Sequence, residues 1–219
     1  MHKLLDVKSG VDLLQANREI AQKNRSFFSE RGIVSVDIMG SIGAGKTLLV
    51  EGMIDILQSN GVLSAVIAGD VAGDADYRRF RKHGIQVENI NTGKECHLDA
   101  HLVDHALQHM SLDGVEVLFI ENVGNLVCPA DFLLGTDRRM VVVSVTEGDD
   151  MVKKHPLIFG LSDVIAINKM DLAEAMEVNP KDLEYDAREI GSKARVVYTD
   201  AKHGKGIEDL MRALELPMG

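Results

Sequence analysis

The stretch that decides the fold is IVSVDIMGSIGAGKT, residues 33–47. It satisfies the pattern GxxxxGK(S/T), and the fixed positions here are Gly40, Gly45, Lys46 and Thr47. The apolar alternation before Gly40 predicts a strand, and the run LLVEGMIDILQ after Thr47 predicts a helix. Because this pattern binds phosphate when a strand precedes it and a helix follows it, we predict a phosphate-binding loop over residues 40–47.

The residue types in this loop suit a nucleotide triphosphate and its magnesium ion. Glycines let backbone N–H groups turn toward an anion, and the positive end of the next helix dipole points at the same place. Lys46 is a point charge for the β- and γ-phosphates, and the Thr47 hydroxyl suits Mg²⁺. The loop residues expected to bind nucleotide are Gly40, Ser41, Gly43, Ala44, Gly45, Lys46 and Thr47.

Composition predicts one acidic globular domain over residues 1–219. The chain is 45% hydrophobic, which is enough to bury one sizeable core. Its formal net charge of −10 argues against nucleic-acid binding, which needs clustered Lys and Arg. Two cysteines are too few for a disulfide framework, and we recognise neither a signal peptide nor an apolar stretch of roughly 20 residues. We therefore expect a cytoplasmic protein that does not insert into membranes.

Apolar segments alternate with helical ones along the rest of the chain. After the first strand, the strand-bearing segments are residues 62–70, 85–91, 115–124, 140–150, 163–171 and 194–200. This order predicts an α/β fold with a mostly parallel β-sheet flanked by helices on both faces, and ligands gather at the carboxyl ends of such strands. A long helix over about 11–31 precedes the sheet, either as a cover on one face or as a surface for another protein.

The pattern NKxD, formed by Asn168, Lys169 and Asp171, indicates a guanine base. The Asp171 carboxylate can accept hydrogen bonds from guanine N1 and the exocyclic amine, whereas adenine presents an acceptor at N1. A buried carboxylate that faces a lone pair is costly, so GTP is favoured over ATP. Lys169 is expected to lie along the ring, and Asn168 to tie this loop to the nucleotide or the phosphate loop. The segment with Asp200 and Ala201 follows the last strand and is expected to offer backbone N–H groups to the guanine oxygen.

Acidic residues near strand ends are candidates for holding Mg²⁺ beside the γ-phosphate and for orienting water. They are Asp37, Asp70, Asp76 and Glu121. Glu121 closes an apolar strand, where a sensor of the γ-phosphate belongs. Its arm is longer than that of the more usual Asp, so we prefer a water-bridged or switching role over direct Mg²⁺ ligation. Asp70 has the alternative role of capping the segment that follows it.

Cys96, His97 and Cys128 are the candidate ligands of a transition metal. Two thiolates and one imidazole suit Zn²⁺ or Ni²⁺, but a closed tetrahedral site needs a fourth ligand. That ligand is His101, a water, or a residue of a second copy in a symmetric dimer. The alternative is two buried structural cysteines with a capping histidine. The further histidines of the helical stretch 95–110 are interpreted as a solvated face.

With these motifs in place, the chain resembles the hydrogenase nickel-incorporation GTPase family, HypB, from about residue 13 to residue 214. The resemblance is carried by GSIGAGKT, NTGKECHLDAHLV, FIENVGNLVCPADFLLG, VTEGDD with KKHP, and INKMDL. It implies a P-loop NTPase fold, with a G domain of the SIMIBI type. It also implies slow hydrolysis of GTP to GDP, dimerisation when GTP is bound, and nickel delivery to a [NiFe]-hydrogenase large subunit precursor together with a HypA-type nickel chaperone.

The resemblance also implies roles for individual residues. Cys96, His97 and Cys128 would form the Ni²⁺ or Zn²⁺ site at the dimer interface. Matching the family's DAxR pattern to residues 76–79 assigns Asp76 to the nucleotide Mg²⁺. The expected catalytic group is Lys46, Thr47, Asp76 and Glu121, with Thr47 and Asp76 on Mg²⁺.

Three other functions stay open. The urease GTPase family, UreG, shares the phosphate loop and NKxD, but its Cys-Pro-His motif is one string, whereas Cys96-His97 and Cys128-Pro129 are separate here. A P-loop kinase of a small metabolite uses the same loop and Mg²⁺, but NKxD argues against it. A metal-storing or scaffold protein that merely binds GDP is the non-enzymatic alternative.

Overall fold

Seven strands form one sheet in the order β3-β2-β4-β1-β5-β6-β7, and all neighbouring strands are parallel. The computed structural model describes the backbone of residues 2–218 and the side chains of residues 12–218. The strands are β1 (Val34–Gly40), β2 (Ser64–Asp70), β3 (Gln86–Asn91), β4 (Val117–Glu121), β5 (Arg138–Ser144), β6 (Val164–Asn168) and β7 (Arg195–Tyr198). The predicted α/β fold is therefore confirmed.

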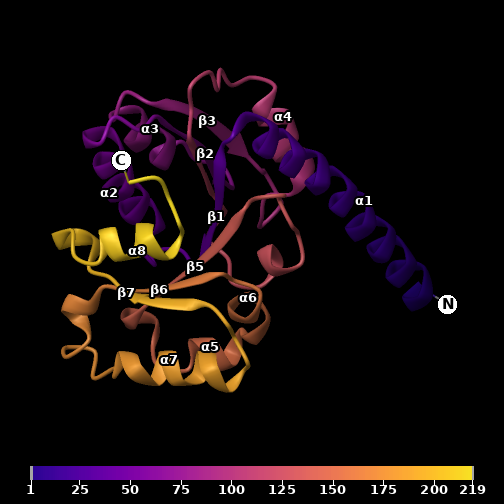
Figure 1. Cartoon of the computed structure of the whole chain (residues 1–219). Helices are drawn as coiled ribbons and strands as arrows, with labels where there is room; N and C mark the ends of the chain where they lie inside the picture. Colours follow the sequence, from indigo (N-terminus) through magenta and orange to yellow (C-terminus); the bar gives the residue numbers. More distant parts are fainter. Residues whose placement is uncertain (1, 219) are drawn as a thin grey trace.

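Helices cover both faces of this sheet (Figure 1). One face carries α2 (Lys46–Ser59), α3 (Ala75–Arg81) and α8 (Ile207–Ala213). The other carries α1 (His2–Arg31), α4 (Ala100–Leu107), α5 (Met151–Lys154), α6 (Pro156–Gly160) and α7 (Pro180–Glu189). Short 3₁₀ turns complete the described chain: η1 (Cys128–Ala130), η2 (Val145–Glu147), η3 (Met170–Leu172) and η4 (Ala201–His203). Because both faces are covered, the five inner strands are almost continuously buried, whereas the edge strands β3 and β7 are partly exposed.

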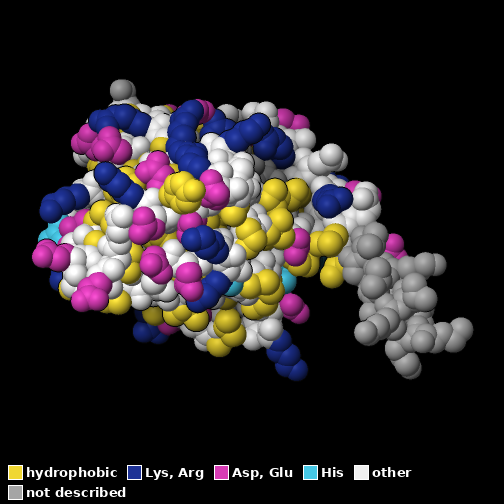
Figure 2. All heavy atoms as spheres, turned by 90° about the horizontal axis from the view of Figure 1, so that it is seen from below, with side chains coloured by type: hydrophobic (Ala, Val, Ile, Leu, Met, Phe, Trp, Pro, Cys, Tyr) yellow, Lys and Arg dark blue, Asp and Glu magenta, His cyan; other side chains and the backbone are white. Residues whose placement is uncertain are grey.

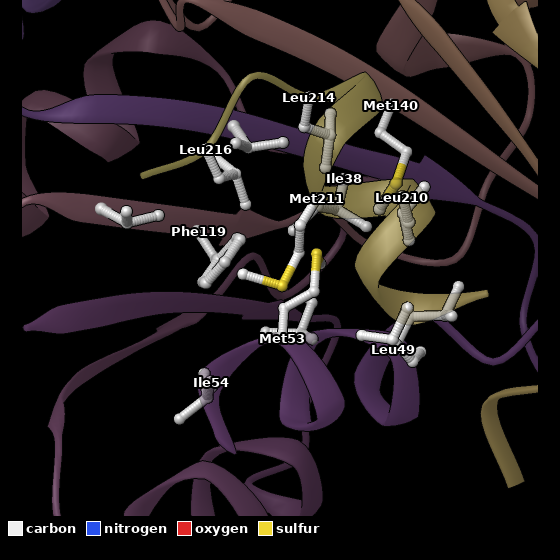
Figure 3. Packing of buried hydrophobic residues seen from close by; sticks show 14 of the residues in the cluster. Ile38, Leu49, Met53, Ile54, Phe119, Met140, Leu210, Met211, Leu214 and Leu216 are labelled. Carbon is white, nitrogen blue, oxygen red and sulfur yellow. The ribbon is translucent and has the colours of Figure 1, made fainter. Parts of the chain in front are cut away.

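The core between α2, α8 and the sheet fixes the helix that follows the phosphate loop. Figure 3 shows Met53 and Ile54 of α2 and Met211 of α8 among Ile38 of β1 and Phe119 of β4. All five side chains are fully buried. Full burial of a large apolar side chain contributes roughly 1.5–3 kcal/mol. This layer therefore holds the start of α2 firmly against the end of β1.

Helix α1 includes the predicted range 11–31, and its N-terminal part projects away from the sheet (Figure 1). Its C-terminal part is a cover, because Phe28 is fully buried and Asn24 Nδ2 donates to the carbonyl oxygens of Ala100 (2.9 Å) and Leu134 (3.0 Å). Asn17 Oδ1 accepts a hydrogen bond from Ala100 N at 2.8 Å. The same helix therefore holds the start of α4. Its use as a surface for another protein stays a prediction.

Helix α4 begins later than the predicted stretch 95–110. Asp99 is its N-cap, and its side chain accepts a hydrogen bond from Leu102 N at 2.8 Å. An aspartate in this position stabilises a helix start because it satisfies a backbone N–H that has no partner within the helix. Residues 95–99 are consequently a turn, and this turn carries Cys96 and His97.

The surface mixes both signs of charge. Lys, Arg, Asp and Glu side chains are interspersed over the face drawn in Figure 2. None of the helices in the described part of the chain has the length and apolar character needed to cross a membrane. The expectations of a single domain over residues 1–219 and of no nucleic-acid partner stay predictions.

Candidate nucleotide and metal sites

The phosphate loop needs glycine at three positions. Gly40, Gly43 and Gly45 have positive φ angles of 147°, 79° and 103°, a region that residues with a Cβ rarely enter. A Cβ on Gly45 would also lie 2.3 Å from Asn168 Nδ2. Helix α2 begins at Lys46, directly after this loop. The loop amides and the positive end of α2 therefore form one region suited to an anion.

Lys46 is held by the loop itself. Its Nζ donates to the carbonyl oxygens of Gly40 (3.1 Å) and Ser41 (3.0 Å). Burial lowers the pKa of Lys46, although three nearby carboxylates act against this shift. An ammonium group held by carbonyl oxygens can exchange them for phosphate oxygens without losing its hydrogen bonds.

The Thr47 hydroxyl lies between two carboxylates. Its Oγ1 is 3.0 Å from Asp76 Oδ1 and 2.9 Å from Glu121 Oε1, yet it has one proton to donate. Burial raises the pKa of Glu121 to about 7; the charge of Lys46 opposes this rise and that of Asp76 adds to it. Glu121 Oε2 is buried and has no hydrogen-bond partner. These oxygens fit a hydrated divalent cation, because Mg²⁺ prefers hydroxyl and carboxylate oxygens and usually keeps several waters, one of which would satisfy the unpaired atom.

These groups face a cavity of about 530 Å³. Its lining residues come from the phosphate loop, from the ends of β2 and β4, and from α3: Ile42, Gly43, Gly45, Lys46, Thr47, Leu48, Gly69, Asp70, Asp76, Arg79, Glu121, Asn122 and Gly124. The structure thus brings the whole expected catalytic group together. Asp70 Oδ1 also accepts a hydrogen bond from Val71 N at 2.7 Å, so Asp70 fulfils the local capping role as well.

A second cavity, of about 300 Å³, adjoins the first, since Gly45 and Leu48 line both. The other residues that line it are Asn168, Lys169, Asp171, Leu172, Asp200, Ala201 and Lys202. Asn168 Nδ2 donates to the carbonyl oxygen of Ala44 at 2.9 Å, and Asn168 Oδ1 accepts from Ala201 N at 3.2 Å. Asn168 therefore joins the phosphate loop to the segment after β7.

Two expected base contacts are engaged within the protein. The Ala201 N–H, expected to face the guanine oxygen, donates to Asn168 instead. Asp200 is 3% exposed, and its Oδ2 lies 2.7 Å from His203 Nδ1. The Asp200 carboxylate thus stabilises the η4 turn. Asp171, in contrast, is exposed at the cavity that would receive the base.

The three candidate metal ligands converge. The ligand atoms of Cys96, His97 and Cys128 lie within 4.8 Å of one another. Cys96 Sγ is 2.9 Å from Cys128 Sγ and 3.8 Å from His97 Nδ1. Both cysteines are free, Cys96 is exposed and Cys128 is half-buried, so the alternative of two buried structural cysteines is wrong. His101, a candidate for the fourth position, lies outside this cluster in the described structure.

The protonation states in this cluster make metal binding depend on pH. The His97 ring is 9% exposed, and its centroid lies 4.0 Å from that of Phe132. Burial lowers the pKa of His97, which favours the neutral imidazole that coordinates metals. The hydrogen bond with Cys128 raises the pKa of Cys96. Metal binding at this pair is therefore expected to release protons.

Asp37 was expected among the candidates for Mg²⁺ or water, and this prediction is wrong. Asp37 is fully buried inside β1 and does not line the phosphate cavity. Its Oδ1 accepts from Asn122 Nδ2 at 3.2 Å, and its Oδ2 lies 3.4 Å from Arg139 Nε. The physical reason is its position in the strand. Asp37 lies three residues before the end of β1, so its side chain is buried beside Asn122 and Arg139 and does not reach the phosphate cavity.

Sequence analysis missed three residues near these sites. Arg79 lines the phosphate cavity, and its Nε donates to Glu51 Oε1 at 3.1 Å. Arg139 is an arginine at the start of the apolar strand β5, and this pattern could have indicated a buried ion pair. Phe132, which packs against His97, follows no recognisable signal.

The comparisons with known proteins agree on one family. The chain matches the family described as CobW/HypB/UreG, nucleotide-binding domain, over residues 34–198. It is 49% identical over 215 residues to a probable hydrogenase maturation factor HypB of Methanocaldococcus jannaschii, covering 98% of this chain and 97% of that protein. The solved hydrogenase maturation factor HypB from Archaeoglobus fulgidus is 48% identical, with a TM-score of 0.84 over 92% of this chain and 98% of that one. HypB from Helicobacter pylori in complex with nickel is 31% identical, with a TM-score of 0.85 over 91% and 94%.

Glu121 makes the stability of the metal-free protein depend on pH. Its pKa is raised from 4.5 to about 7, so its stabilising contribution is complete below pH 4.5 and is lost as the pH rises through 7. Glu121→Gln removes this dependence. We subtract the unfolding free energy of the variant from that of the wild type at each pH. This difference should be about 2 to 3 kcal/mol larger at pH 5 than at pH 8. Urea unfolding with chelator measures it, and a difference that does not vary with pH would contradict the assignment.

Proposed function

Because the chain belongs to the CobW/HypB/UreG nucleotide-binding family, we propose that it is a metal-regulated GTPase that inserts nickel during [NiFe]-hydrogenase maturation. Its relatives are hydrogenase maturation factors, and one of them has been solved with nickel. The observation that carries the proposal is the convergence of Cys96, His97 and Cys128 in a region that Asn125 links by hydrogen bonds to Gly40 of the phosphate loop.

The nucleotide in this proposal is GTP. Asp171 is exposed at the smaller cavity and supplies a carboxylate for guanine N1 and the exocyclic amine. The smaller and the larger cavity share Gly45 and Leu48, so a base in one continues into phosphates in the other. This arrangement favours a GTPase over a P-loop kinase of a small metabolite.

Hydrolysis in this proposal needs four residues. Lys46 binds the β- and γ-phosphates in exchange for its loop carbonyls, and Thr47 and Asp76 would hold Mg²⁺. When bound, Mg²⁺ neutralises the charge that develops on the phosphate oxygens. Glu121 is the residue we assign to orienting the attacking water, or to a switching role, because it has an oxygen without a partner and a pKa raised to about 7.

The cargo site in this proposal is the pair of thiols with the His97 imidazole. Such a donor set suits Ni²⁺ or Zn²⁺. Cys96 is exposed, so an ion can enter and leave without opening the core. An accessible site with three protein ligands is more suitable for a protein that transfers its metal than for a protein that stores it.

The two sites are linked through one carbonyl group. The carbonyl oxygen of Gly40 accepts from Lys46 Nζ (3.1 Å) and also from Asn125 N (3.0 Å), and Asn125 Nδ2 donates to the carbonyl oxygen of Cys96 (3.3 Å). When Lys46 turns to a phosphate, the Gly40 carbonyl keeps Asn125 N as its donor and no longer shares its lone pairs with Lys46. That hydrogen bond can then tighten, and the Asn125 segment moves with it. Nucleotide state therefore alters metal affinity, and by linkage metal alters nucleotide affinity equally.

Partners complete the proposal. A homodimer formed with GTP bound would supply the missing fourth ligand from a second copy. Lys154 is a further candidate for contact across that dimer. A HypA-type nickel chaperone would deliver the ion, and a [NiFe]-hydrogenase large subunit precursor would receive it. Two free cysteines are consistent with a cytoplasmic location.

Asp171→Asn tests the base. The amide oxygen could still accept from guanine N1–H, but the amide NH₂ would face the exocyclic amine, which is also a donor, so GTP affinity should fall about 100-fold. Affinity for xanthosine triphosphate should rise, because its base carries an oxygen where guanine has the amine. Isothermal titration with both nucleotides measures the exchange. If Asp171→Asn binds GTP like the wild type, Asp171 does not read the base.

Titration of GTP, ATP, Ni²⁺ and Zn²⁺ into wild type and Cys96→Ala tests the proposed function. The wild type should bind GTP in preference to ATP, bind Ni²⁺ or Zn²⁺, and hydrolyse GTP. Cys96→Ala should bind metal at least about 10-fold more weakly, yet bind GTP in the same range. Negligible GTP turnover with and without metal would instead favour a metal-storing protein that binds nucleotide only. Equal metal affinity in both proteins would exclude the thiol site.

A further inference from the structure

One buried ion pair lies beneath both turns that carry the metal-ligand candidates. Asp37 of β1 is fully buried, and the Arg139 side chain of β5 is 11% exposed. Asp37 Oδ2 lies 3.4 Å from Arg139 Nε. Neither residue lines the phosphate cavity or the base cavity, so the nucleotide site does not explain this pair.

Arg139 holds the turn that carries Cys128. Its Nη2 donates to the carbonyl oxygen of Pro129 at 2.7 Å, and Pro129 directly follows Cys128 in η1. The same nitrogen lies 3.2 Å from Met39 Sδ. The guanidinium plane is thus fixed on one side by Asp37 and on the other by the backbone of η1.

Asp37 holds the turn that carries Cys96 and His97. Its Oδ1 accepts from Asn122 Nδ2 at 3.2 Å. Asn122 Oδ1 in turn accepts from the backbone N–H of Leu98 at 2.9 Å, and Leu98 directly follows His97. Asn122 is 1% exposed and Leu98 is fully buried, so this arm also lies inside the protein.

We propose that Asp37 and Arg139 are positioning residues of the metal site, which set the distance between the Cys96–His97 turn and the Cys128 turn. This inference rests on the proposed metal site. The two thiols are 32 positions apart in the chain and come from separate turns, yet their sulfur atoms lie 2.9 Å apart. A metal ion accepts only a narrow range of ligand distances, so the two turns need a common anchor. The ion pair is that anchor, because Arg139 contacts the Cys128 turn directly and Asp37 reaches the Cys96–His97 turn through Asn122.

A stabilising role alone does not account for this pair. Removing two charges from water is costly, and apolar residues of similar volume generally serve a buried layer at least as well. Groups around a metal site that orient its ligands typically change metal affinity by roughly 10- to 100-fold when they are removed. The effect expected here is on the metal site rather than on folding.

The double variant Asp37→Leu with Arg139→Met tests the inference. It removes both charges together, so neither is left buried without its partner, and the fold is retained. Ni²⁺ is titrated into full-length protein and followed by thiolate-to-nickel charge-transfer absorbance, and GDP affinity is measured in parallel. The dissociation constant for Ni²⁺ should rise about 10-fold or more, with a changed absorbance spectrum, while GDP affinity stays within about twofold. Arg139→Lys, which keeps the charge but loses the planar fork, should give an intermediate value.

Asp186→Asn is the matched control. Asp186 is also a buried aspartate in an ion pair, 2.9 Å from Lys153 Nζ, but it is connected to neither metal-bearing turn. It should leave Ni²⁺ affinity unchanged. The positioning role would be overturned if the double variant bound Ni²⁺ with wild-type affinity, or if Asp186→Asn weakened Ni²⁺ binding equally. In either case, weaker Ni²⁺ binding by Cys96→Ala would still support the metal site. A wild type whose Ni²⁺ binding did not depend on Cys96 would overturn both.

Discussion

The Thr47 hydroxyl has one proton and two carboxylates beside it, and this imbalance organises the nucleotide end of the molecule. Asp76 comes from α3 and Glu121 from the end of β4, so three separate elements meet at one oxygen atom. Without a cation, Glu121 holds a proton below about pH 7, because burial and, to a smaller extent, the charge of Asp76 raise its pKa to about 7. A cation beside Thr47 would stabilise the ionised carboxylate of Glu121, so Glu121 would lose its proton. The contact between the end of β4 and Thr47 would then change.

The segment after β4 also holds the candidate metal ligands: Cys128 belongs to it, and Asn122 and Asn125 bind the turn that carries Cys96 and His97 through hydrogen bonds. Glu121 and Asn122 are adjacent, and they face different parts of the protein. Glu121 contacts the phosphate loop through Thr47, whereas Asn122 contacts Asp37 and the backbone of Leu98. Asn125 then reaches the carbonyl oxygen of Cys96. We expect a shift of a few tenths of an ångström at this segment to move both sulfur atoms, because packed interiors transmit displacement rather than absorb it.

Sequence analysis captured what local patterns determine. The phosphate loop follows from a strand, fixed glycines and a helix start, and most of the seven strands follow from apolar runs, so the fold was predictable. The failures concern three-dimensional placement. Asp37 looked like a strand-end carboxylate, but its depth within β1 depends on where the strand ends. The late start of α4 depends on the Asp99 cap, and the packing of Phe132 against His97 joins residues far apart in the chain. The short helices α5 and α6 and the helix α7 were not assigned, because their apolar periodicity is brief or weak.

The central claim is that the nucleotide and metal sites are energetically coupled through the end of β4 and the Gly40 carbonyl. The most direct test is the dissociation constant for Ni²⁺ measured on one protein preparation with Mg²⁺ and either a non-hydrolysable GTP analogue or GDP. The account predicts a difference of at least about fivefold between the two states, and an equal change in analogue-to-GDP preference when Ni²⁺ is present. The same Ni²⁺ dissociation constant in both states would contradict it.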